Sequence, residues 1–221
     1  MGHFDGDFLA FFSELALNNN KTWFDKNRGR YEKSVKKPFS NFVEEMIVRI
    51  HSRNPDILID PSEAIFRINR DIRFSNNKTP YKLHMGAFIS PGGKKAKNDP
   101  GFYFQLGFAG IRIYSGVYQI SKEDLLKIRR YIAENLHAFG AILKNDVFKS
   151  KYNTIQGERH QRIPTEFKPI AEKQPLIANK DFYVSALLDE KQITNPELSD
   201  LLMSYYLAAE SLLVFLNSAL R

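Results

Sequence analysis

The stretch FRINRDIRFSNNKTPYK, residues 66–82, determines how the centre of this chain is expected to fold. In its first half, apolar and polar side chains alternate, which is the pattern of a β-strand with one apolar face. The apolar members of this alternation are Phe66, Ile68, Ile72 and Phe74. The run SNNKTP at 75–80 is rich in turn-forming residues and predicts a turn, and residues 82–90 predict a second strand.

The alternation of apolar and polar side chains continues after a loop that contains Pro91-Gly92-Gly93 and several lysines. The runs FYFQLGF at 102–108 and IRIYSGV at 111–117 predict a third and a fourth strand, and DFYVSAL at 181–187 predicts one more. Because the first four strands are joined by short links, we expect an antiparallel β-meander of about four or five strands.

Helical spacing dominates both ends of the chain. Residues 21–36 predict one helix, and Pro38 is suited to the first turn of the next, whose apolar residues recur every three or four positions. Those residues are Phe39, Phe42, Val43, Met46, Ile47 and Ile50. Ser121 with Asp124 resembles a capping box, and a last helix is expected to end near Leu220. We therefore predict a single α+β domain, residues 1–221, whose sheet is covered by N-terminal and C-terminal helices.

The excess positive charge of the protein is local. Residues 67–97 hold eight basic residues and one acid, Asp71, and this balance equals the formal net charge of the whole chain, +7. The basic residues are Arg67, Arg70, Arg73, Lys78, Lys82, Lys94, Lys95 and Lys97. A concentrated cationic surface attracts anions in a way that a diffuse one does not, so the sequence predicts an anion site.

Three arginines on one short strand match the planar, bidentate recognition of phosphate or carboxylate. Arg70 falls on the apolar face of the predicted strand, where it either borders a cleft or is a core arginine bonded to a Glu or to helix carbonyls. Asp71 is expected to pair with a flanking arginine, which would orient the guanidinium and lower the pKa of the acid. The polar face has a second interpretation as a solvated, salt-bridged strand.

Four residues within and after the turn complete the candidate ligand-binding set. Lys78, Tyr81 and Lys82 are predicted to close around the same anion, and His84 lies on the same face as Lys82. If Asp71 or Tyr81 met His84 in space, acid–base chemistry would be possible, although a lone strand histidine is more often structural. No nucleophile stands out, so whether any reaction follows is left open, and no cofactor or metal is predicted because the five histidines lack metal-ligand spacing.

Three functional interpretations remain open from the residues. The first is an anionic small molecule, bearing phosphate or carboxylate, bound at the arginine-rich strand and turn. The second is nucleic acid bound by the same residues and the Lys94–Lys97 loop, with binding that weakens steeply in salt. The third is a structural protein in which the arginines form an internal salt-bridge network.

Several of these segments resemble one known family. FRINRDIRFSNNKTPYK with HMGAFISPGG behind it, NNNKTWFDKNRGRY at 18–31 and DFYV at 181–184 are similar, in this order, to the domain of unknown function 2461 family. The resemblance implies a single soluble domain and no particular chemistry. It also implies which positions to test first: Arg67, Arg70, Asp71, Arg73, Lys78, Pro80, Tyr81 and Lys82.

The composition of the chain bears on its cellular location and on membrane segments. The chain has no cysteine, which excludes disulfides and thiolate metal sites and fits a reducing, cytoplasmic location. The N-terminus has no basic region and carries two acids in its first seven residues, so we expect no signal peptide. No apolar run is long enough to predict a membrane span.

Overall fold

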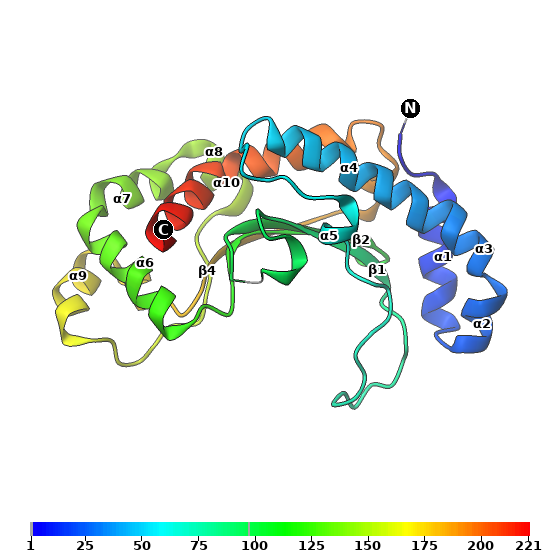
Figure 1. The fold of residues 1–221 in the computed structure, drawn as a ribbon, viewed down its shortest axis with the longest axis horizontal. Coiled ribbons are helices and arrows are strands. Elements are labelled where there is room, and N and C mark those ends of the chain that lie inside the picture. The colour runs from blue at the N-terminus through cyan, green and yellow to red at the C-terminus, as the bar shows by residue number, and fades with distance from the viewer. Residues whose placement is uncertain (1, 97) are drawn as a thin grey trace. The chain divides into compact units, whose positions relative to one another are not determined.

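The computed structural model describes residues 2–96 and 98–221 and shows an α+β protein (Figure 1). Four strands form one antiparallel sheet in the order β1-β2-β3-β4. The strands are β1 (His84–Ile89), β2 (Gly101–Gly107), β3 (Gly110–Val117) and β4 (Phe182–Leu188). The predicted fold class is therefore confirmed, with β4 as the strand expected at 181–187.

The turn between β2 and β3 depends on one glycine. Gly110 has a φ of +92°, a backbone conformation that side chains with a Cβ rarely adopt. A Cβ at this position would also lie 2.3 Å from the carbonyl oxygen of Leu188. Backbone conformation and close packing therefore both require glycine where the chain re-enters the sheet.

The chain divides into two compact units, each assembled from three segments. The first unit comprises Met1–Lys95, Tyr103–Ile113 and Leu187–Met203, and the second comprises Ala96–Phe102, Tyr114–Ala186 and Ser204–Arg221. The first unit carries the candidate site, and the second carries most of the C-terminal helices. A single domain stays a prediction.

The first unit begins with a nearly continuous helical section. Its helices are α1 (Gly6–Leu17), α2 (Lys21–Lys26), α3 (Arg28–Arg30), the π-helical η1 (Tyr31–Lys36), α4 (Lys37–His51) and α5 (Pro61–Ala64), with short 3-10 turns η2 (Gly93–Lys95) and η5 (Glu190–Thr194) later in the chain. Pro38 lies in the first turn of α4, as expected, although η1 leads into α4 without a break.

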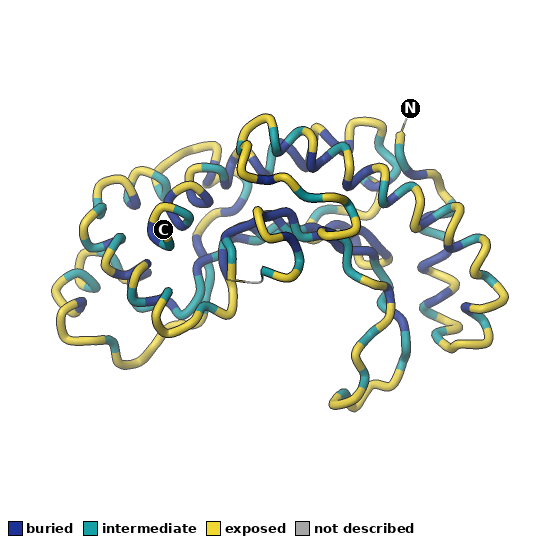
Figure 2. Tube along the Cα trace, in the orientation of Figure 1, coloured by how far each residue is buried: buried dark blue, intermediate teal, exposed yellow. Residues whose placement is uncertain are grey.

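The core of the first unit is formed by rings from α1 and α4. All six residues of the predicted α4 stripe are buried (Figure 2). Phe39 and Phe42 lie against Phe104 of β2, with ring centroids 6.1 and 5.6 Å apart. On α1, Phe8 and Phe12 are fully buried and contact each other edge to face. Burial of such large side chains dominates the stability of a core.

The second unit contains the remaining helices. They are α6 (Lys122–Glu134), α7 (Leu136–Lys144), α8 (Asp146–Tyr152), η3 (Thr165–Phe167), α9 (Lys168–Lys173), η4 (Pro175–Ala178) and most of α10 (Leu198–Leu220). The Ser121 hydroxyl caps α6 by accepting a hydrogen bond from the Asp124 N–H at 3.1 Å, which confirms the cap predicted there. Beside the sheet, Gln156 forms a single antiparallel bridge with Tyr183 of β4.

Within the described residues, α10 is the helix long and apolar enough to cross a membrane, with a mean hydropathy of 1.3 over its most apolar window. Half of that window is buried inside the protein. Core helices of water-soluble proteins have the same length and composition, so the length and hydropathy of α10 are weak evidence for a membrane span. The absence of a membrane span stays a prediction.

The strand predicted at 66–74 is not a regular strand, and this prediction is wrong. Residues 66–82, which we name the arm, leave α5, extend away from β1 and return to it (Figure 1). Single antiparallel bridges join Ile65 to Ala87 at the foot of the arm and Asn69 to Tyr81 further out. Beyond Asn69 the two sides of the arm form no further bridge within the described chain.

The end of pairing has a local cause. The Arg70 N–H still donates to the Pro80 carbonyl at 2.8 Å, but proline has no N–H to return the bond. The chain then turns at Ile72, whose carbonyl accepts from the Ser75 N–H at 3.3 Å, earlier than the predicted turn. Phe74 is consequently 95% exposed, although the alternating pattern placed it on the buried face.

Candidate functional site

The base of the arm is held by the N-terminal helical section. The Asn19 side-chain oxygen accepts from the Tyr81 N–H, and the Asn19 side-chain amide donates to the Tyr81 carbonyl, both at 3.0 Å. The Tyr81 ring is buried and stacks on Phe24, with centroids 4.0 Å apart and planes at 15°. Tyr81 is therefore fixed in the core, and its predicted role of closing over a ligand has no support in this placement.

The NNN sequence at 18–20 explains how Asn19 reaches this position. Asn18 ends α1, and its backbone N–H donates to the Leu15 carbonyl. Asn20 caps the start of α2 by accepting from the Trp23 N–H at 2.9 Å. The central asparagine is thus held between two helix ends, and both of its amide atoms are used by the arm.

Arg70 binds the opposite side of the arm rather than an acid. Its guanidinium donates to the Thr79 carbonyl at 3.0 Å, to the Thr79 hydroxyl, and to the Ser75 hydroxyl at 3.4 Å. Thr79 is itself fixed because its N–H and hydroxyl both donate to the Asn77 side-chain oxygen. Arg70 therefore closes the tip of the arm, and neither the expected Glu nor a helix carbonyl is its partner.

Asp71 pairs with Arg73, as the sequence predicted. Arg73 Nε donates to Asp71 Oδ1 at 3.0 Å and Nη2 donates to Oδ2 at 2.7 Å. These bonds, followed by that of the Arg73 backbone N–H, lower the pKa of Asp71 to about 2. The fork is oriented by the acid, while the Arg73 side chain is 76% exposed.

The two lysines of the arm donate to backbone carbonyls. Lys78 Nζ lies 3.0 Å from the Ile72 oxygen, and Lys82 Nζ lies 2.9 Å from the Arg67 oxygen. Burial, and secondly the charge of Arg67, lower the pKa of Lys82. Lys78 is exposed, whereas Lys82 is half-buried over the Phe66 ring, 5.6 Å from its centroid.

The arm is left with a net positive charge. It contains five basic residues and one acid, and Asp71 is bonded to Arg73. Arg67 is exposed, and within residues 2–96 and 98–221 its guanidinium has no hydrogen bond or ion pair. The bonds of Arg70, Lys78 and Lys82 to neutral oxygens hold the arm together without cancelling charge.

His84 begins β1 and is half-buried. Burial, and secondly the positive charges of Lys82 and Arg112, lower its pKa to about 4. The imidazole is therefore uncharged at neutral pH. Among the described residues no hydrogen bond joins His84 to Asp71 or Tyr81, its predicted acid–base partners; Asp71 binds Arg73, and the Tyr81 ring stacks on Phe24.

The Lys94–Lys97 loop is only partly available to a ligand. Lys94 Nζ donates to the Ser62 and Ile65 carbonyls at 2.5 and 2.7 Å, which attaches the loop to the end of α5. Lys95 is exposed, and Lys97 lies outside the described residues. This loop is therefore a structural contact in addition to being a source of charge.

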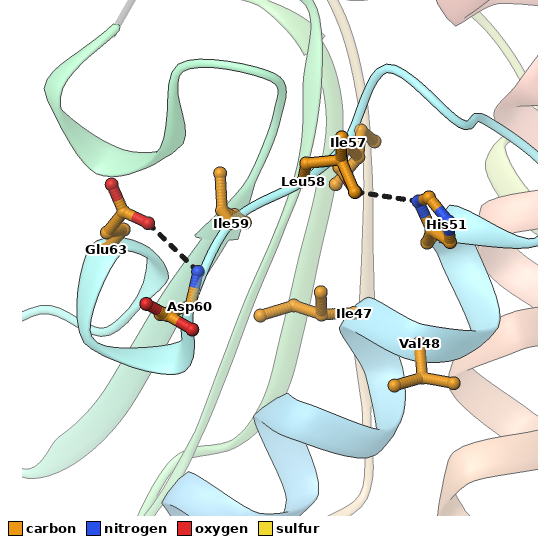
Figure 3. Close-up of a pocket in the computed structure, with 8 residues that line it drawn as sticks. All are labelled: Ile47, Val48, His51, Ile57, Leu58, Ile59, Asp60 and Glu63. Carbon is orange, nitrogen blue, oxygen red and sulfur yellow. Dashed lines mark hydrogen bonds between the residues drawn. The ribbon is translucent and has the colours of Figure 1, made fainter.

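A hollow of about 360 Å³ lies elsewhere in the first unit, between the end of α4 and the segment leading to α5 (Figure 3). It is lined by Ile47, Val48, His51, Ile57, Leu58, Ile59, Asp60 and Glu63. His51 Nδ1 lies 3.1 Å from the Ile57 carbonyl, and the Asp60 N–H donates to Glu63 at 2.9 Å. These polar groups serve local structure, and the arm does not line this hollow.

Among the residues that the structure describes, 2–96 and 98–221, there is no group of three or more His, Asp or Glu side chains placed to hold a metal ion. The sequence prediction also missed two residues, one that holds the arm and one that lies in it. One is Asn19, whose signal was an asparagine run between two predicted helices. The other is Phe74, whose signal was its place immediately before a polar turn.

These features define the class of the protein as an α+β meander with a cationic arm. The family model described as conserved hypothetical protein (DUF2461) matches residues 7–215 of the chain, and the chain belongs to this family. Searches of the curated proteins and of the solved structures found no match.

Proposed function

We propose that the protein binds a phosphate-bearing anion through the exposed cations of the arm. The observation that carries this proposal is the arm's unbalanced charge, since five basic side chains face one acid, Asp71, which is bonded to Arg73. Arg67, Arg73 and Lys78 are the exposed members of the set and would contact the ligand. No reaction is proposed, because the arm presents donors and charge without an activated nucleophile.

The arm suits phosphate groups for a chemical reason. The guanidinium of Arg73 is planar and oriented by Asp71, which takes the Nε donor and one Nη2 donor, so Nη1 and the second Nη2 hydrogen are left to contact anionic oxygens. Lys78 adds a point charge on the other side of the turn. An extended segment with spaced cations suits a ligand with several phosphates in a row better than one enclosed small anion.

The contacts of the remaining cations support a structural role beside the binding role. Arg70 and Lys82 each donate to carbonyls of the arm itself. Their substitution is therefore expected to loosen the arm, whereas substitution of Arg67 and Arg73 removes charge from exposed positions. The hypothesis of an internal network and the hypothesis of anion binding thus apply to different residues of the same segment.

The test compares two charge reversals of equal size. The double variant Arg67→Glu/Arg73→Glu changes the arm, and Lys144→Glu/Lys149→Glu changes two exposed lysines of the second unit by the same charge. Binding of inorganic polyphosphate is measured by thermophoresis at low and at physiological salt. Each unit charge beside a phosphate contributes about 1 kcal/mol in water, and two reversals change the arm by four unit charges. Even if salt screens half or more of this, the arm variant should bind at least about tenfold more weakly.

The control variant is expected to keep most of the wild-type affinity. Equal losses in both variants would mean that only the overall charge matters, and the proposal of an arm site would then be wrong. It would also be wrong if the wild-type protein bound no polyphosphate at low salt.

A further inference from the structure

Phe74 is far more exposed to solvent than any other described phenylalanine. Its side chain is 95% exposed, and the next most exposed phenylalanine of the described chain, Phe108, is 50% exposed. Scattered apolar surface residues are ordinary in proteins, so exposure alone carries no inference. The position of Phe74 is the informative feature, because it lies at the tip of the cationic arm.

The ring of Phe74 is accompanied by a held cation. The Arg73 guanidinium carbon lies 5.8 Å from the ring centroid, and the same guanidinium is fixed by Asp71. Arg70 closes the tip through Thr79 and Ser75, so the turn that presents the ring is itself braced. An aromatic face beside oriented cations is the combination with which proteins stack unpaired bases while binding the phosphates between them.

We propose that the arm binds single-stranded nucleic acid, with one base stacked on Phe74 and phosphates held by Arg67, Arg73 and Lys78. This inference rests on the proposed function and names its ligand. A single strand is chosen because its base faces are free to stack on a side chain, whereas the bases of a duplex are stacked on one another. The chain from Arg67 to Phe74 can span at most about 25 Å, which is the length of a few nucleotides.

An anionic membrane surface is the other partner that an exposed ring among cations suggests. The tip does not favour it, because Ser75, Asn76 and Asn77 follow the ring and would lose water if the turn entered a bilayer. A single phenylalanine is also a small apolar anchor compared with those that hold proteins on membranes. Base stacking leaves the same polar groups in water.

The experiment separates stacking from charge by using two strands with the same phosphates. Fluorescence anisotropy measures binding of a labelled oligothymidine and of an abasic oligonucleotide of equal length and label. Stacking of one base predicts that the wild-type protein prefers the base-bearing strand by about tenfold. Phe74→Ala should reduce this preference to about one, Phe74→Trp should retain it, and Phe108→Ala, the matched control, should leave it unchanged.

Each result bears on a different step of the argument. Equal wild-type affinity for the two strands, or an unchanged preference in Phe74→Ala, overturns the stacking inference and leaves polyphosphate binding intact. Loss of binding to both strands in Arg67→Glu/Arg73→Glu supports the charge contacts. Binding of phosphatidylserine vesicles that depends on Phe74, without any preference for bases, overturns the choice of nucleic acid in favour of a membrane.

Discussion

Replacing Asn19 by alanine should release the arm from the helices that hold it. The substitution removes both hydrogen bonds to the Tyr81 backbone, each 3.0 Å long in the native protein. A hydrogen bond of this kind contributes about 1 kcal/mol net, so opening of the arm should become easier by about 2 kcal/mol. That free energy corresponds to an open population about 30 times larger.

Limited trypsin digestion measures this population directly. The arm contains five potential cleavage sites, at its arginines and lysines. When the arm closes faster than trypsin cleaves, the cleavage rate follows the open population, so Asn19→Ala should be cut within 66–82 about 30 times faster than the wild type. Global unfolding, followed by circular dichroism in urea, should change by no more than about 2 kcal/mol.

The neighbouring residue supplies the control. Asn18 is exposed, and its side chain donates to the Glu14 carbonyl within the same helix. Asn18→Ala should therefore change arm cleavage less than about threefold, since it removes no bond to the arm. If Asn18→Ala and Asn19→Ala were cleaved at the same rate, the side chain of Asn19 would not be what holds the arm, and the reasoning would be refuted.

Two further changes test the protein away from the arm's base. The pKa of His84 is about 4 in the folded state and about 6.5 in the unfolded state. Between these pH values the unfolded state binds more protons than the folded state. The free energy of unfolding should therefore fall by an amount on the order of 3 kcal/mol as the pH drops from 6.5 to 4. His84→Gln should lose this part of the pH dependence in urea titrations, and an identical slope would contradict it. In the second unit, the buried Arg129 donates to the Ile177 and Asn179 carbonyls at 2.9 and 3.3 Å, so Arg129→Leu should cost about 3 kcal/mol and lower the Tm by about 10 °C. A Tm within about 2 °C of the wild type would show that the two carbonyls find other donors.

Much of the fold could be predicted from local patterns. The α4 stripe, the alternation at 102–108 and the Ser121 cap each depend on residues within a few positions of one another, and all three are present in the structure. The pairing of Asp71 with Arg73 was predictable for the same reason, because the two side chains are two positions apart.

The features that the sequence could not show depend on distant partners. Arg129 is a charged residue of α6, and its acceptors lie 48 and 50 residues away. Asn19 and Tyr81 are separated by 62 positions. The alternation at 66–74 is the same in a buried strand and in an exposed arm, because the pattern records which side chains are apolar and not whether a neighbouring strand is present.

In the candidate site, too, the sequence shows some features and leaves others to the fold. The sequence tells which residues of the arm are charged, but the acceptor of each cation depends on how the chain folds back at Ile72. Arg70, Lys78 and Lys82 reach oxygens on the opposite side of the arm, five or more positions away. Only after these bonds are known can Arg67 and Arg73, which donate to no oxygen across the arm, be separated from the cations that do, of which Lys78 is also exposed.

The single bridges beside β1 and β4 have a consequence for solubility. These two strands are the outer members of the sheet, and an uncovered outer strand offers its peptide groups to other molecules. Ile65 occupies part of β1 at Ala87, and Gln156 occupies part of β4 at Tyr183. Each outer strand is thus partly covered by an irregular segment of the chain itself, which shortens the run of peptide groups open to the strand-to-strand aggregation that exposed β-edges promote.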